Sequence, residues 1–139
     1  MLPDEVPKVN LFARYIPKGM SWNDEYHLQY PEHEQTGGFS FASVLLDKND
    51  LGQVVQDQNV IDSEERTFGE YQGVYLKYNS IAKSGTFNQR IYLVCPDLYR
   101  VIMIYIGDDV SKEDAIKVAE NLVITRNTTM VKTAGMLLE

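Results

Sequence analysis

The stretch FNQRIYLVCPDLYRVIMIYIGDDVSKEDAIKVAENL, residues 87–122, decides the fold class of this chain. An apolar run over residues 91–95 is followed by a break at Pro96 and by a second apolar run over residues 101–106. Short apolar runs separated by a turn are typical of buried strands joined in a hairpin. The sequence therefore predicts a strand, a tight turn and a second strand, with a helix after them.

The helix is predicted over residues 111–122. Ser111, with Asp114 three positions later, resembles a capping box, and the acidic first turn suits the positive end of the helix dipole. The apolar residues recur at helical spacing and form one stripe, consisting of Ala115, Val118, Ala119 and Leu122. Because the two alanines are small, we expect this stripe to pack closely across the strand at 101–106.

The remaining apolar pattern favours β-structure. Further strands are predicted over residues 22–30, 39–46, 63–68 and 74–78, with turns at the intervening glycine, proline and asparagine positions. Residues 11–16 fit either a short strand or a helical turn, and 51–60 has ambiguous helical spacing.

These elements predict one α+β domain. We expect a curved antiparallel sheet of about six strands, arranged as a meander, with a C-terminal helix packed across one face. The predicted domain spans residues 11–124, preceded by a flexible N-terminal arm over residues 1–10 and followed by a C-terminal extension over 125–139.

Composition limits the partners that this chain can take. It has 139 residues, with 20 acidic against 13 basic side chains and a formal charge of -7. A surface of this sign repels phosphate backbones and anionic lipid headgroups, so neither nucleic acid nor direct membrane insertion is expected. Cys95 is the single cysteine, which excludes an intrachain disulfide.

The strand at 101–106 is apolar on both faces, although the predicted helix can cover only one. The other face is closed by the chain itself or serves as a binding surface for a protein or a small apolar ligand. On the second interpretation, aromatic and sulfur-containing side chains of the later strands form the site, namely Tyr75, Tyr92, Met103 and Tyr105. Aromatic residues also favour strands for their cross-strand packing alone.

Three other patterns are interpreted as structural. His27 and His33 stand among the carboxylates Asp24, Glu25, Glu32 and Glu34, but their spacing suits a solvated acidic hairpin tip better than a metal site. The run from Asp47 to Gly52 starts like a calcium loop, yet Leu51 and Gln58 replace required ligands, which favours a turn. Cys95 lies in an apolar strand and is expected to be an inert buried thiol. No cofactor, metal ligand or catalytic residue is therefore predicted.

Three short motifs carry a resemblance to a known family. They are YIPKGM at residues 15–20, FGEYQGVY at 68–75 and AIKVAENL at 115–122. Their order resembles a bacterial domain of unknown function found in the extracytoplasmic parts of anti-sigma-factor-like proteins and lipoproteins. The resemblance covers about residues 11–124 and implies a sensory or interaction domain outside the membrane, tethered by a part of the protein absent here.

The sequence thus favours a non-enzymatic binding or sensing module, bacterial and extracytoplasmic, although a cytoplasmic protein also fits. One alternative is a carrier that holds a small apolar ligand on the open sheet face. A weaker alternative is a hydrolase with a site assembled from His27, His33 and Asp97. A carrier requires an apolar cavity of several hundred cubic ångströms, and a hydrolase requires a histidine beside a nucleophile or a metal.

Overall fold

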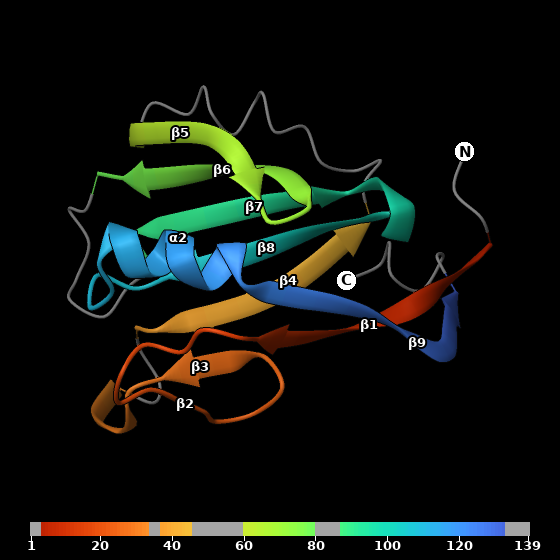
Figure 1. Ribbon diagram of the computed structural model, residues 1–139, viewed down its shortest axis with the longest axis horizontal. Helices are drawn as coiled ribbons and strands as arrows, with labels where there is room; N and C mark the ends of the chain where they lie inside the picture. The colour runs from red at the N-terminus through yellow and green to blue at the C-terminus, as the bar shows by residue number, and fades with distance from the viewer. Residues whose placement is uncertain (1–3, 34–36, 46–59, 80–86, 133–139) are drawn as a thin grey trace.

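The computed structural model describes residues 4–33, 37–45, 60–79 and 87–132 (Figure 1). The predicted calcium-like turn at 47–52 and most of the ambiguous 51–60 segment lie outside these residues. In chain order the elements are β1 (Glu5–Ala13), β2 (Ser21–Trp22), β3 (His27–Gln29), the 3₁₀ turn η1 (Pro31–His33), β4 (Phe39–Leu45), β5 (Val60–Phe68), β6 (Tyr71–Tyr78), β7 (Gln89–Cys95), the 3₁₀ turn η3 (Pro96–Leu98), β8 (Arg100–Ile106), α2 (Lys112–Glu120) and β9 (Leu122–Lys132).

The main sheet confirms the predicted α+β class and its antiparallel pairing. It has seven strands in the order β2-β3-β4-β8-β7-β6-β5, so the apolar strand β8 lies fourth, at the centre. Two meanders, β2–β4 and β5–β8, are joined by the antiparallel pairing of β4 with β8, in which Phe41 lies opposite Ile104. The central position explains why β8 is apolar on both faces.

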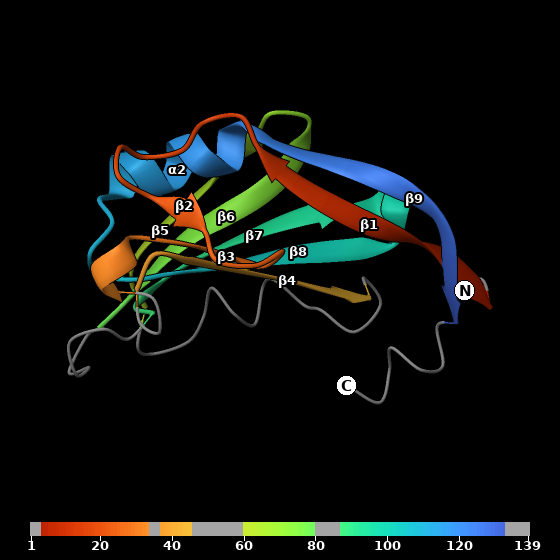
Figure 2. The ribbon, with the colours of Figure 1, turned by 90° about the horizontal axis from the view of Figure 1, so that it is seen from below.

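Helix α2 packs across one face of this sheet, as its apolar stripe predicts (Figure 2). Ala115, Val118 and Ala119 are buried in the same core cluster as the even-numbered isoleucines of β8. The Ser111 hydroxyl accepts a hydrogen bond from the Asp114 backbone N–H at 3.1 Å, which confirms the predicted N-cap. The helix is shorter than predicted, because Leu122 already begins β9.

The two ends of the described chain form strands that the sequence did not predict. Residues 5–10, expected as a flexible arm, belong to β1, and residues 125–132, expected as an extension, belong to β9. These strands pair antiparallel as a separate two-stranded sheet, with Leu11 opposite Ile124. We call this sheet the ribbon; Figure 2 shows that it lies on the same side of the main sheet as α2.

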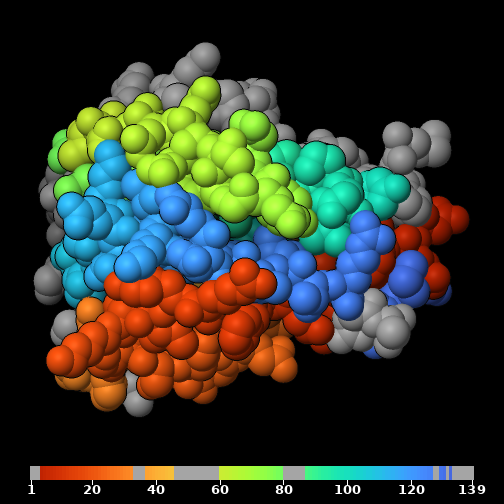
Figure 3. Space-filling view, viewed as in Figure 1, coloured from red at the N-terminus to blue at the C-terminus, as the bar shows by residue number. Residues whose placement is uncertain are grey.

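The side chain of Arg100 connects the ribbon to the main sheet through hydrogen bonds. Its side chain is buried, and its guanidinium donates hydrogen bonds to the carbonyl oxygens of Leu98 at 3.2 Å and Pro7 at 2.9 Å. Val9 and Leu11 of β1 pack against the main core cluster. In the space-filling view α2 and β9 form a band between β5 and the N-terminal segment, so this face of the sheet is largely covered (Figure 3).

The predicted strand at 22–30 is instead a small hairpin. β2 and β3 pair antiparallel, with Trp22 opposite Leu28, and residues 23–26 form the turn between them. The Asp24 carboxylate accepts a hydrogen bond from the Tyr26 backbone N–H at 2.7 Å, which stabilises this turn. Because β3 is so short, it covers only the first part of the neighbouring strand β4.

Candidate binding groove

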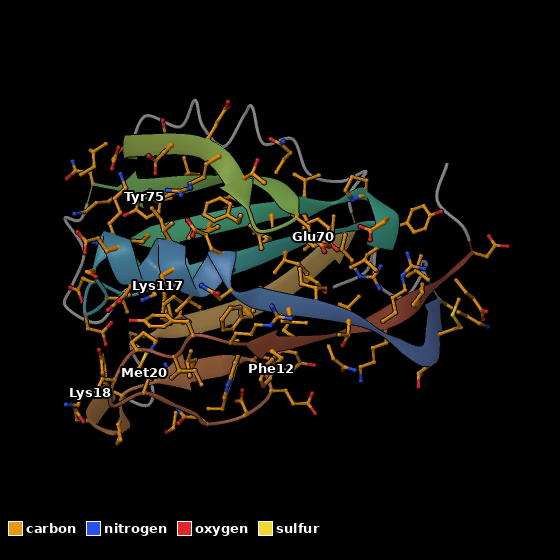
Figure 4. All side chains as sticks on the ribbon, viewed as in Figure 1. Phe12, Lys18, Met20, Glu70, Tyr75 and Lys117 are labelled. Atoms are coloured by element: carbon orange, nitrogen blue, oxygen red, sulfur yellow. The ribbon has the colours of Figure 1, made fainter. Side chains whose placement is uncertain are left out.

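The four predicted binding residues do not share one face of the sheet. Tyr75 lies opposite Ile91 in the β6–β7 register, whereas Tyr92 lies opposite Val74, so their side chains alternate to opposite faces. Tyr75 is fully buried on the helix face, and its hydroxyl donates to Gln89 Oε1 at 2.6 Å. Figure 4 places Tyr75 beside α2. Its assignment to the binding surface is therefore corrected to a core position.

Tyr92, Met103 and Tyr105 do share the other face, but its centre is closed. Tyr92 is only 2% exposed and belongs to a second buried cluster with Val74, Leu76 and Val101. The four side chains of this cluster are buried by other parts of the same chain, so they offer a ligand little accessible surface.

An arginine occupies the more accessible part of this second face. The Arg90 guanidinium carbon lies 4.6 Å from the ring centre of Tyr78 and 5.1 Å from that of Tyr105. Its Nη1 donates to the Tyr92 hydroxyl at 3.4 Å. The tyrosine rings therefore contact a cationic side chain of the same chain. This part of the face is not the uncovered apolar surface that the sequence suggested.

The histidine and cysteine candidates do not assemble a reactive centre among the described residues. His27 Nδ1 lies 2.9 Å from Asp24 Oδ1, and across the parts of the chain that the structure describes no three metal-binding side chains converge. The side chain of His33 lies outside the described residues. Cys95 is buried, and burial raises the pKa of its thiol to about 12, so the thiolate nucleophile does not form near neutral pH.

His27 and Asp97 lie at opposite ends of the sheet. His27 lies opposite Ser40 of β4, and Ser40 lies opposite Tyr105 of β8. Asp97 follows Cys95, which lies opposite Arg100 at the other end of β8. The five positions from Arg100 to Tyr105 correspond to roughly 17 Å of strand. Two of the predicted hydrolase residues, His27 and Asp97, are thus not brought together.

A better candidate for a binding site is a groove of about 550 Å³ between the ribbon and the open edge of the main sheet. One wall is residues 8–12 of β1, and the others come from Trp22, the turn at 24–26, and residues 41–43 of β4. We call this space the edge groove. Its volume lies within the range of pockets that take small organic ligands.

Four aromatic side chains line the edge groove, namely Phe12, Trp22, Tyr26 and Phe41. Phe12 is 60% exposed and Tyr26 is 49% exposed, although each is large and mainly apolar. Trp22 is half-buried, and its ring centre lies 5.4 Å from that of Phe41 in a tilted arrangement. Figure 4 shows Phe12 near the end of β1. Exposed aromatic residues around a concave space are typical of a recognition site.

The rim of the edge groove carries charge of both signs. Lys8 lies on the β1 side, and Asp24 and Glu25 lie in the β2–β3 turn. Hydrogen bonds from the Tyr26 backbone and the His27 side chain hold the pKa of Asp24 below its ordinary value, so this carboxylate is ionised at neutral pH. The turn therefore presents an anionic end to a ligand.

Comparison with protein families shows to which family the chain belongs. Residues 13–122 match a domain of unknown function, DUF4367, and this span is well over half of the 139 residues. The chain belongs to the DUF4367 family. The predicted resemblance to a domain of unknown function is thereby confirmed. None of the curated proteins searched matches it.

The DUF4367 span divides the edge groove. It starts at Ala13, the last residue of β1, and ends at Leu122, the first residue of β9. The sheet edge and the β2–β3 turn therefore lie inside the family span, while residues 8–12 lie before it. Sequence reasoning missed the groove because residues 8–10 were predicted as part of a flexible arm and residues 11–12 as part of a short strand or a helical turn. The available signal was the aromatic character of Phe12, Trp22 and Tyr26 beside short polar turns.

Proposed function

We propose that this DUF4367 domain is a non-enzymatic binding or sensing module, and that the edge groove is its site for an apolar or aromatic group. The observation that carries the proposal is the combination of a groove of about 550 Å³ with the exposed rings of Phe12 and Tyr26. The short motifs that resemble anti-sigma-factor-like proteins and lipoproteins support placing the module outside the membrane of a bacterium. The longest helix of the described residues, α2 with nine residues, is too short to cross a membrane.

The chemistry of the edge groove supports binding over catalysis. Its lining includes the hydroxyl of Ser43, but no hydrogen bond joins this hydroxyl to an imidazole among the described residues. His27 is instead paired with Asp24 at the exposed turn. Without a base to activate it, a serine hydroxyl is a weak nucleophile.

A carrier of a small apolar ligand is the second candidate, and the groove volume favours it. In that case the ligand occupies the edge groove, not the second sheet face on which the sequence placed it, because Tyr92 is buried there. Both candidates require apolar contact with Phe12 and Trp22, so one experiment tests the site for both.

The proposed test uses the single tryptophan as a reporter. Trp22 lines the groove, and the chain has no other tryptophan. Titration with the neutral dye N-phenyl-1-naphthylamine should quench Trp22 emission by energy transfer while the dye emission rises. Phe12→Ser should weaken dye binding about fivefold, because roughly 1 kcal/mol of apolar contact is lost.

Ile61→Ser is the matched control. Ile61 is also 60% exposed, but it lies on β5 at the opposite edge of the sheet. This variant should bind the dye within a factor of two of the parent chain. The proposal is rejected if the dye leaves Trp22 emission unchanged, or if the two variants lose affinity equally.

A further inference from the structure

We infer that the natural occupant of the edge groove is an extended, positively charged peptide segment of a partner protein, which pairs as an added strand with the free edge of β4. The inference rests on the edge groove being the binding site, as proposed above. It is carried by the backbone of β4, by the absence of charge along that edge, and by the acidic turn beside it.

The outer edge of β4 is unpaired over its second half. The β3–β4 register ends with His27 opposite Ser40, and the Phe41 backbone N–H donates to the Tyr26 carbonyl at 2.8 Å. Beyond Phe41, no strand of the described residues pairs with this side of β4, and Ala42 and Ser43 are exposed.

Alternation along β4 identifies the backbone groups that face the groove. Because the Phe41 N–H points away from β8, the backbone groups of Ser43 and Leu45 point the same way, while those of Ala42 and Val44 point toward β8. An incoming strand therefore finds the N–H and carbonyl of Ser43 ready to bond, as in recognition by strand addition. The stretch from Phe41 to Leu45 is roughly 14 Å long, which accommodates a peptide of about five residues.

The two edges of the main sheet differ in how they are protected. The edge strand β5 carries Asp62, Glu64, Glu65 and Arg66, and charge of this kind discourages pairing with another chain. The free part of β4 is Ala-Ser-Val-Leu over residues 42–45 and carries no charge. An uncharged, unpaired edge that opens into a groove is suited to accept a strand.

The charge around the edge groove determines which kind of peptide strand it attracts. Asp24 and Glu25 outnumber Lys8 at the groove rim, and the whole chain has a formal charge of -7. This field attracts a basic peptide and repels an acidic one. A second copy of this chain is disfavoured because two chains that each carry a formal charge of -7 repel one another, and its edge strand β5 would add further carboxylates.

The test uses the capped peptide acetyl-Lys-Val-Thr-Phe-Thr-Val-Lys-amide, whose apolar side chains alternate on one face. Trp22 emission, or displacement of N-phenyl-1-naphthylamine, reports its binding. Exchange of both lysines for glutamate should weaken binding about tenfold or more, from lost attraction at the acidic turn. Equal binding of the two peptides would overturn the charge assignment.

Backbone methylation of the peptide tests strand pairing without altering the protein. Successive N–H groups of a strand point to opposite sides, so methylation of the phenylalanine nitrogen and of the following threonine nitrogen should have different effects. One should weaken binding about tenfold, and the other should leave it within about threefold. Equal effects of the two methylations would overturn strand addition.

Ser43→Pro tests the same contact from the side of the protein. Proline removes the outward N–H and is tolerated on an edge strand, so the chain should fold but bind the peptide about tenfold more weakly. Ser43→Ala keeps the N–H and should bind within about twofold. If the dye binds in a Phe12-dependent manner but the lysine peptide does not bind, the peptide inference fails while the proposed function stands. If neither binds, both fail.

Discussion

Replacing Tyr75 with phenylalanine tests whether this residue belongs to the core, as the structure places it, or to a binding surface. Tyr75 is 0% exposed and donates a hydrogen bond to Gln89 Oε1 at 2.6 Å. Gln89 Nε2 in turn donates to the carbonyl oxygens of Gly107 at 2.9 Å and Val110 at 2.8 Å. These bonds connect β6 and β7 to the turn that precedes α2.

The expected loss of stability follows from the number of hydrogen bonds. Tyr75→Phe removes one buried bond and leaves Gln89 Oε1 without this donor, which should lower the free energy of unfolding by about 1–3 kcal/mol. Gln89→Leu removes three bonds and should cost about 3–5 kcal/mol. Once Gln89 is gone, the Tyr75 hydroxyl has lost its acceptor, so the double variant should be about 1–2 kcal/mol more stable than the sum of the single changes predicts.

Urea unfolding followed by circular dichroism measures these differences, and titration with N-phenyl-1-naphthylamine measures the groove in the same variants. Tyr75→Phe should lose stability and keep the dye affinity of the parent chain, because Tyr75 does not line the edge groove. Additive effects in the double variant would refute the coupled network. Unchanged stability of Tyr75→Phe with weaker dye binding would return Tyr75 to the binding surface.

Three further predictions concern pH, the helix cap and a close backbone approach. Burial raises the pKa of the Cys95 thiol from its ordinary value of 9.0 to about 12, so the folded chain keeps a proton that the unfolded chain releases above about pH 9. The stability that the buried thiol contributes below pH 9 should therefore be lost as the pH rises toward 12. In urea unfolding measured at a series of pH values, Cys95→Ala should remove the decline in the free energy of unfolding between about pH 9 and 10. An unchanged decline would contradict this assignment. Ser111→Ala should lower the free energy of unfolding by about 1 kcal/mol through loss of the N-cap, and a loss below about 0.3 kcal/mol would show that the cap contributes little. Gly73→Ala should cost about 2 kcal/mol or more, because the added Cβ would clash with the backbone carbonyl oxygen of Tyr92. A thermal melt equal to that of the parent would contradict this contact.

The sequence by itself determined the centre of the molecule. The apolar run at 101–106 predicts a strand buried on both faces, and β8 is the fourth of seven strands. The stripe on α2 and the cap at Ser111 are likewise local patterns, read from residues three and four positions apart. Such features are predictable because hydrophobic periodicity and capping depend on near neighbours in the chain.

Only the tertiary structure decided the pairing of the chain ends and, with it, the edge groove. Leu11 of β1 finds its partner Ile124 at the far end of the sequence, and no local signal specifies that pairing. The faces of Tyr75 and Tyr92 depend on strand register, in which a shift of one residue moves a side chain to the opposite face. The sequence therefore identified aromatic candidates such as Tyr75 and Tyr92, but long-range pairing buried them. The exposed rings of Phe12 and Tyr26, which the sequence did not single out as binding residues, became recognisable only in the tertiary structure.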